Sequence, residues 1–280
     1  VILVGDHHQL PEIGAGGGFR AALDALSHRA SELTINRRQH HQWEHVALNR
    51  LRSGDVAAFW NTYTEHHRVV LADTANDIRN RAVADWWDTH TAGGSAYLLA
   101  GTRTEAKLLN TLARRHASEA GHLTGATLDL RGRPLQVGDR IVLLRNMGGQ
   151  LDLDTGARCR VDNGMIATIT HINHHSSDIN IELANGRHLQ LTGDYVQAGC
   201  IDHGYATTIH KAQGLTCDDI YVVGPAGLYR ESGYVALSRA RNTAHLYATT
   251  RDAANVAEPA LTSDNTLPTE NVDDPEHDLI

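Results

Sequence analysis

Two groups of arginines in this sequence have side-chain chemistry suited to phosphate. Arg37 and Arg38 end the short apolar segment "LTINRRQ" (33–39), and Arg239 and Arg241 lie in "YVALSRAR" (234–241). A guanidinium group is always charged and can donate to two oxygens at once, as phosphate recognition requires. Taken one at a time, such arginines are more often plain surface charges, so their meaning depends on the surrounding sequence.

A glycine cluster at residues 14–18 is a second candidate for phosphate binding. It follows the opening apolar run of residues 1–4 by ten residues, and glycine-rich loops after a strand can cradle a phosphate. A P-loop ends in Gly-Lys-Ser/Thr, however, whereas Phe19 and Arg20 follow this cluster. We therefore interpret it as a flexible turn before a helix.

The segment "HQWEH" (41–45) contains the H-x-x-E-H pattern of some zinc peptidases. His41 and His45 would share one face of a helix, but zinc needs a third ligand and a defined pocket. The chain has 19 histidines, so chance matches are expected. We favour a solvated helix face and predict no metal ligands here, and a zinc hydrolase is kept as an alternative.

Alternating strands and helices must position these residues. We expect strands at residues 1–4, 33–39, 67–73 and 96–101, and helices at 19–30, 41–64, 74–91 and 102–121, the last ending at Gly121. This alternation predicts an α/β fold with a parallel sheet. From about residue 131 to 198 the pattern becomes β-rich, with Asn185-Gly186 as a strong hairpin signal, and strand–helix–strand returns afterwards.

Composition limits the class of protein. The chain has 280 residues, of which 41% are apolar, with no 18-residue apolar run and no export signal, so we predict a cytoplasmic protein without a membrane partner. Three cysteines without a CxxC pair argue against a disulfide framework. The acidic tail (251–280) has eight acids and one arginine, so the net charge of −8 leaves only −1 for residues 1–250. A nucleic-acid or nucleotide role is therefore not excluded.

Four segments together resemble the conserved motifs of a known family. They are "GDHHQLP" (5–11), "NRRQ" (36–39), "TTIHKAQGLT" (207–216) and "YVALSRAR" (234–241). In this order and spacing they resemble motifs III, IV, V and VI of the superfamily 1 helicases. The resemblance covers about residues 1–250 and is closest to the RecD-like branch, which includes the helicase half of conjugative relaxases of the TraI and TraA type.

The resemblance implies a fold and a division into domains. In these helicases the Walker A and Walker B motifs lie upstream of motif III in a first RecA-like domain, so we expect this chain to be a piece of a longer protein. We expect the end of the first RecA-like domain at 1–30, the second RecA-like domain at 31–130 and 199–250, an inserted small β-barrel at 131–198, and a disordered acidic tail at 251–280.

The resemblance also implies residue roles. The expected contacts to ATP, whose Mg²⁺ would be bound mainly by the upstream domain, come from Asp6, Gln9, Arg38, Gln213, Gly214 and Arg239. Among these, Gln9 would contact the γ-phosphate or the attacking water, and Arg38 and Arg239 would be the arginine fingers, with Arg37 and Arg241 as alternatives. The expected contacts to single-stranded DNA come from Thr102, Thr207, Thr208, His210 and Lys211.

The predicted function is thus the C-terminal part of an ATP-dependent single-stranded-DNA translocase or helicase in conjugative transfer, with 5′→3′ polarity by resemblance. Because Walker A and Walker B are expected upstream, we predict that this chain alone hydrolyses ATP poorly. The alternative is a degenerate helicase-like module that binds DNA without hydrolysis. Intact Gln9, Arg38 and Arg239 disfavour that alternative, because a module that only binds DNA needs no phosphate sensors.

Overall fold

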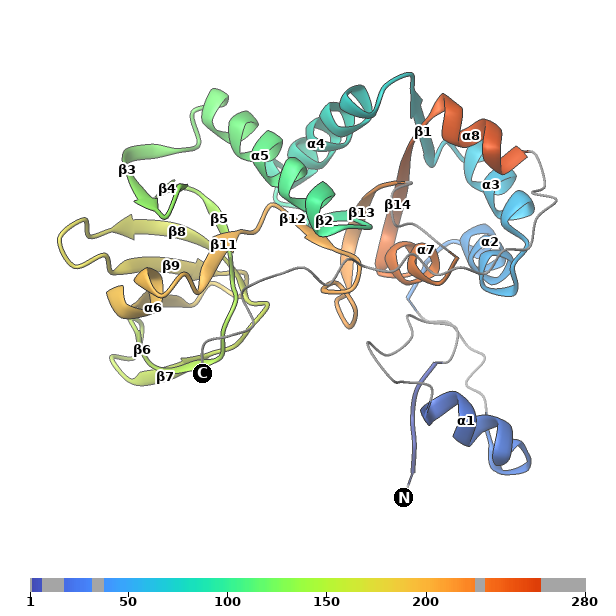
Figure 1. Cartoon of the computed structure of the whole chain (residues 1–280), viewed down its shortest axis with the longest axis horizontal. Helices are drawn as coiled ribbons and strands as arrows, with labels where there is room; N and C mark the ends of the chain where they lie inside the picture. The colour runs from blue at the N-terminus through green and yellow to red at the C-terminus, as the bar shows by residue number, and fades with distance from the viewer. Residues whose placement is uncertain (1, 7–17, 32–37, 225–229, 258–280) are drawn as a thin grey trace.

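The computed structural model describes residues 2–6, 18–31, 38–224 and 230–257, and these residues form three sheets (Figure 1). The α/β part of the chain contains a five-stranded sheet of order β1-β14-β13-β2-β12, in which every pairing is parallel. Its strands are β1 (Val69–Ala72), β2 (Ala96–Ala100), β12 (Ala206–Thr208), β13 (Cys217–Val223) and β14 (Ala240–Thr249). The predicted α/β class is confirmed.

Helices cover both faces of the parallel sheet. One face packs against α4 (Ala75–Thr91) and α5 (Arg103–Glu119). The other packs against α2 (Gln42–Ser53), α3 (Val56–Glu65) and α7 (Arg230–Leu237). Successive strand residues point to opposite faces, so in β13 Ile220 and Val222 join the second core while Tyr221 and Val223 join the first.

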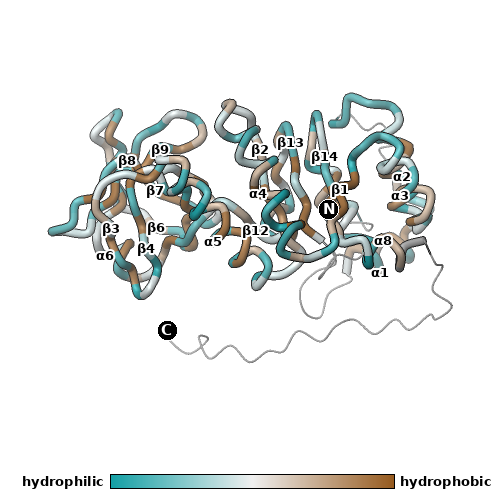
Figure 2. Tube along the Cα trace, turned by 90° about the horizontal axis from the view of Figure 1, so that it is seen from above, coloured by the Kyte–Doolittle hydropathy of each residue, from teal (hydrophilic) through white to brown (hydrophobic). Residues whose placement is uncertain are grey.

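The β-rich part forms a separate antiparallel sheet beside the parallel one (Figures 1 and 2). Its order is β11-β5-β8-β9-β10-β6-β7. The strands are β5 (Arg140–Leu143), β6 (Met147–Asp152), β7 (Arg158–Val161), β8 (Ile166–Ile172), β9 (Ile179–Leu183), β10 (His188–Leu191) and β11 (Ile201–His203), and the short helix α6 (Gly193–Gln197) follows β10. We call these elements, with the hairpin β3 (Thr124–Leu130) and β4 (Arg133–Val137), the β-module.

In the β-module the predicted hairpin is confirmed, whereas closure into a barrel stays a prediction. Strands β9 and β10 form the hairpin expected around Asn185-Gly186, with Gly186 at φ +78° and its N–H donated to Leu183 O at 2.9 Å. Pairings in the described residues do not join the two edge strands β7 and β11, so closure into a barrel stays a prediction. The domain limits at 131 and 198 also stay predictions.

Some predicted elements differ from the structure. Residues 2–6 form no strand: Ile2 and Val4 are 90% and 87% exposed, and no described strand pairs with them. The helix expected over 41–64 is two helices, because Gly54 at φ +95° ends α2 in the left-handed conformation. Most of the strand predicted at 33–39 lies within residues 32–37, which are outside the described residues.

The acidic tail also begins later than predicted. Residues Thr250–Ala257 form α8, whose start is capped reciprocally: Thr249 N donates to Asp252 Oδ2 at 3.1 Å, and Asp252 N donates to Thr249 Oγ1 at 3.2 Å. Residues 258–280 lie outside the described residues. The remaining short helices are α1 (Gly18–Ala25) and η1 (Ser27–Arg29). In the described residues no helix is both long and apolar enough to cross a membrane.

His90 near the end of α4 should make stability depend on pH. Burial, then the positive charges of Arg140 and His122, lowers its pKa to about 4. Between that value and the ordinary pKa near 6.5, the unfolded chain binds more protons, so the free energy of unfolding should fall as pH decreases, by up to about 1.4 kcal/mol per pH unit. Urea unfolding at pH 7 and pH 5 measures this change.

The variant His90→Phe should reduce that pH dependence, because it keeps a ring stacked on Trp86, whose centroid lies 4.9 Å from the imidazole. The matched control is His174→Gln, an exposed histidine of the β-module, which should leave the pH dependence as in the wild type. Equal pH dependence in His90→Phe and the wild type would contradict the assignment.

Candidate functional site

Arg239 lies in a two-residue connection between helix α7 and strand β14. The residue is only 4% exposed. Its Nε donates to Val235 O at 2.9 Å, and its Nη2 donates to Ser238 Oγ at 3.2 Å. The last turn of α7 therefore fixes this guanidinium beside the amino end of β14.

Arg38 reaches the same connection from a distant part of the sequence. Its Nη1 donates to Ser238 O at 2.6 Å, on the residue next to Arg239. Burial lowers the pKa of Arg239, and the positive charge of Arg38 lowers it further. Two guanidinium groups this close repel each other, and an anion with several oxygens, such as phosphate, would offset the repulsion.

Asp6 approaches this arginine pair from the N-terminal segment. Its carboxylate lies 3.7 Å from Arg52 Nη2 of α2, and its negative charge raises the pKa of Arg239 against the effect of burial. Tyr234 of α7 also lies near these charges, since burial raises its pKa and Asp6 raises it further. Gln9 and Arg37 lie outside the described residues, so their roles stay predictions.

The alternative arginine in this motif has a different environment. Arg241 has a side chain that is 55% exposed, and its Nη1 lies 3.8 Å from Asp218 Oδ1. Arg239 instead lies within one residue of the carbonyl that Arg38 binds. The geometry therefore favours Arg239 over Arg241 as the partner of Arg38.

Gln213 and Gly214 are exposed in the turn that connects β12 to β13, and Gly214 has φ +91°. Three residues later, Cys217 N donates to Arg239 O at 3.2 Å. The turn therefore ends beside the connection that contains Arg239.

The five residues predicted to contact DNA come from the opposite end of the strands. Thr102 follows β2, and Thr208 ends the neighbouring β12, where it pairs with Ala100. Thr102 Oγ1 accepts from Glu105 N at 3.1 Å and caps α5, while Thr208 Oγ1 accepts from Lys211 N at 3.4 Å. The turns that follow these two adjacent strand ends therefore lie at one edge of the sheet, and each is held by a threonine hydroxyl that accepts from a backbone N–H three residues later.

The residues at the end of β12 and directly after it differ in their exposure to solvent. His210 and Lys211 are exposed, Thr207 is half-buried, and Thr208 is buried. Thr208 therefore has a structural role in its turn, whereas His210 and Lys211 can contact a ligand directly. Arg103 and Lys107 of α5 are exposed as well and add positive charge to this helix.

Two family models match the chain. The AAA domain family matches residues 1–74, and the UvrD-like helicase C-terminal domain family matches residues 203–247. The second match contains Thr207, Thr208, His210, Lys211 and Arg239.

Curated relatives extend the match along most of the chain. The probable conjugal transfer protein TraA of Sinorhizobium fredii is 31% identical over 255 residues, which cover 88% of this chain and 22% of that protein. The conjugal transfer protein TraA of Agrobacterium fabrum is 31% identical over 254 residues, with the same coverage of 88% and 22%. The chain thus spans about a fifth of the length of these relatives.

Solved helicase structures share the fold. A Pif1 helicase from Candida albicans has a TM-score of 0.55 at 17% identity and covers 91% of this chain and 64% of its own. Pif1 from Bacteroides in complex with ADP-AlF3 and ssDNA has a TM-score of 0.52 at 17% identity, covering 87% and 61%. The chain is thus similar in sequence to a UvrD-like helicase C-terminal domain and to conjugal transfer proteins, and it is similar in fold to Pif1 helicases. The resemblance found in its motifs is confirmed, and so is a RecA-like parallel sheet.

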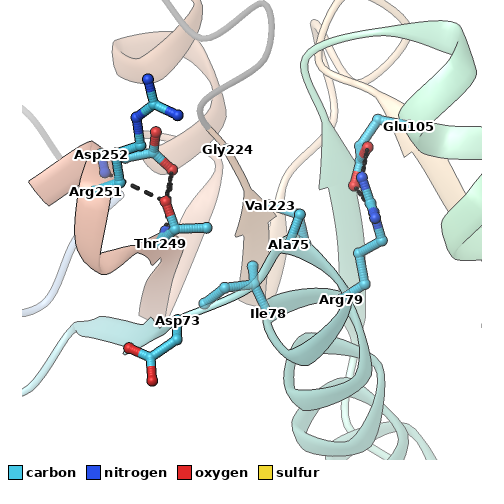
Figure 3. A pocket seen from close by; sticks show the side chains of 10 residues that line it. All are labelled: Asp73, Ala75, Ile78, Arg79, Glu105, Val223, Gly224, Thr249, Arg251 and Asp252. Carbon is cyan, nitrogen blue, oxygen red and sulfur yellow. Dashed lines mark hydrogen bonds and ion pairs between the residues drawn. The ribbon is translucent and has the colours of Figure 1, made fainter.

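A cavity formed by described residues lies away from the arginine pair. It has a volume of about 360 Å³ and opens at the carboxyl edge of the sheet (Figure 3). Arg79 and Glu105 form a two-bond ion pair on one side, at 2.6 and 2.9 Å. The other charged residues that line the cavity are Asp73, Arg251 and Asp252, so acids outnumber arginines, and this lining does not favour phosphate.

The described residues offer no metal centre. No three His, Cys, Asp or Glu side chains within them gather closely enough to hold a metal ion. In "HQWEH", His41 is exposed, whereas His45 Nε2 lies 2.7 Å from Gln39 O and Glu44 is buried, where it accepts from Tyr63 OH at 3.2 Å. His45 and Glu44 thus make structural contacts, and we assign ligands of Mg²⁺ to none of the described residues.

Sequence reasoning missed two side-chain amides that hold the motifs in place. The buried Gln39 contacts the connection that contains Arg239, and the partly buried Asn110 of α5 binds the backbone of Tyr205 and Ala206 at the start of β12, at 2.9 and 3.0 Å. Gln39 belongs to the quoted "NRRQ" segment, so its position was a usable signal. For Asn110 we find no local signal, because its partners lie 95 residues away.

Proposed function

We propose that this chain is the C-terminal motor region of an ATP-dependent translocase or helicase that moves on single-stranded DNA in the 5′→3′ direction during conjugative transfer. The observation that supports this most strongly is the convergence of Arg38 and Arg239 on Ser238, from segments 200 residues apart. The alternative, a module that binds DNA without hydrolysis, is not favoured, because such a module has no use for a paired phosphate sensor.

In this proposal the nucleotide lies between two domains. A first RecA-like domain upstream would hold ATP and Mg²⁺, because this sequence contains no Gly-Lys pair and hence no Walker A lysine loop. Arg38 and Arg239 would stabilise the charge that develops on the γ-phosphate. Gln9 would contact the γ-phosphate or the attacking water, and Asp6 would hold the loop that contains Gln9. Gln213 and Gly214 would link the DNA side to the nucleotide.

The proposed domain division follows the sequence. Residues 1–30 would end the first motor domain, 31–130 and 199–250 would form the second, and 131–198 would be an insertion in the second. Opening and closing of the two motor domains with each ATP would then move the bound strand.

The proposed DNA contacts lie at the carboxyl ends of β2 and β12. Thr102, Thr207, His210 and Lys211 would bind phosphates without reading base edges, and Thr208 would hold their turn in place. Pif1 from Bacteroides was solved with ssDNA bound, and the shared fold supports a similar ligand here.

Removing the exposed lysine of this segment tests the DNA contact. Lys211→Ala should weaken binding of labelled single-stranded oligonucleotides to the same extent for different base sequences, because a phosphate contact is lost. It should also reduce the slope of log K against log salt by about 0.7, the value for one phosphate contact on a single strand. Fluorescence anisotropy over a salt series measures both quantities.

The matched control is Arg115→Ala, which removes one exposed charge near the far end of α5, where Arg115 Nε lies 3.9 Å from Glu119. It should keep the wild-type affinity and slope. If Lys211→Ala binds like the wild type while Arg115→Ala does not, the proposed DNA edge is misplaced. If the wild type itself binds no single-stranded DNA, the proposed function fails.

A further inference from the structure

We propose that Gln39 is a positioning residue that fixes both arginines of the site, an inference that rests on the proposed function. Gln39 follows Arg38 directly in the sequence and is buried, with 5% of its surface exposed. Its Nε2 donates to Ser238 O at 3.1 Å and to Ala240 O at 2.8 Å. These two carbonyls flank Arg239 on either side.

The chemistry of the amide explains why glutamine suits this position. Both partners are carbonyl oxygens, which only accept, so the side chain must present two N–H groups from one atom. An amide nitrogen does so, whereas a carboxylate has no proton to donate and a thioether donates none. The orientation of the amide is therefore determined by its partners.

Gln39 also fixes the separation of the two arginines. Arg38 Nη1 and Gln39 Nε2 share the acceptor Ser238 O, at 2.6 and 3.1 Å. The next carbonyl, that of Arg239, accepts from Cys217 N at 3.2 Å. The carbonyls of Ser238, Arg239 and Ala240 are thus all bonded, and Gln39 donates to the first and the third of them.

Helix α2 in turn holds the backbone of Gln39. His45 Nε2 lies 2.7 Å from Gln39 O, and since a carbonyl can only accept, the ring must donate from Nε2. The contacts therefore run from His45 through Gln39 to the two residues that flank Arg239. This arrangement gives the "HQWEH" segment a role in the arginine site that needs no metal.

The functional consequence concerns turnover rather than ATP binding. A displacement of about 1 Å in a group that acts on the transition state can cost about 10²-fold in rate. In the full-length protein, Gln39→Met should therefore lower DNA-stimulated kcat by about 10²-fold while the Kd for ATP stays at the wild-type value. The exposed Gln42, at the start of α2, provides the matched control Gln42→Met, which should keep the wild-type kcat.

A second variant separates positioning from loss of fold. Gln39→Glu keeps the size of the side chain but cannot donate when ionised, so it should show a similar loss of kcat, and the melting temperatures of both Gln39 variants establish that the assays are done on folded protein. In an Arg239→Lys background, Gln39→Met should cost less than in the wild type, because the group it positions has already been changed.

The outcomes distinguish this inference from the function on which it rests. If Arg239→Ala abolishes turnover but folded Gln39→Met and Gln39→Glu keep the wild-type kcat, the positioning role is overturned and the proposed function stands. If Arg239→Ala also keeps the wild-type kcat, the proposed function itself fails. A loss in both Gln39 variants at unchanged ATP affinity supports the inference.

Discussion

Replacing Arg239 with alanine in the full-length protein is expected to lower the rate of ATP turnover by about 10³- to 10⁵-fold, the range found for arginines that stabilise phosphoryl transfer. The reason is that this guanidinium would act on charge that develops only in the transition state. ATP binding should persist, because the nucleotide is proposed to be held by the upstream domain. Single-turnover hydrolysis and equilibrium binding of ATP measure the two effects separately.

Arg241→Ala is the matched control for that experiment. It removes a guanidinium two residues away whose side chain is 55% exposed and lies 3.8 Å from Asp218, so turnover should stay within a few-fold of the wild type. The reverse result, with Arg241→Ala inactive and Arg239→Ala active, would show that the arginine finger has been assigned to the wrong residue.

Replacing Asp139 with alanine should lower the free energy of unfolding by about 3–5 kcal/mol, the usual cost of removing one partner from a buried ion pair. Asp139 is fully buried in the β-module. It lies 3.0 Å from Arg114 Nε of α5 and accepts from Tyr205 OH and Gln136 N, both at 2.7 Å. Its loss would leave a cation and two donors without their acceptor. Urea unfolding of the 280-residue chain measures the change.

The control for this variant is Asp162→Ala in the same β-module. Asp162 pairs with Arg160 at 2.9 Å, but both side chains are more than half exposed, so the expected change is below about 1 kcal/mol. Similar losses in the two variants would contradict the special role of Asp139. Because Arg114 and Tyr205 belong to the parallel-sheet unit, a large loss for Asp139→Ala alone would also show that the β-module and this unit are joined through the buried aspartate.

The sequence by itself determined the main architecture. Strand β2, helix α5 and the β9–β10 hairpin all depend on local signals: an apolar run, a capping threonine with a glycine stop, and Asn185-Gly186. Such signals act between residues close in sequence, so their physical cause is visible there. The spacing of the four motifs likewise indicated the helicase relationship that the comparisons confirm.

The sequence signals were less reliable where neighbours decide the structure. Residues 1–4 have the composition of a buried strand, yet residues 2–6 form none, because a strand exists only where a partner strand supplies its hydrogen bonds. The composition of residues 41–64 predicts one continuous helix. Gly54 instead adopts the left-handed conformation and ends α2.

Only the tertiary structure decided how the site is held together. The contacts of Arg38 and Gln39 with Ser238 join residues about 200 positions apart, and Asn110 binds Tyr205 across 95 positions. Nothing local in the sequence encodes such pairings, because they form when the sheet order β1-β14-β13-β2-β12 brings distant segments together. The same packing determines the exposure of the two arginines in the last motif. Arg239 is 4% exposed, whereas the side chain of Arg241, two residues later, is 55% exposed, and the short motif alone does not show this difference.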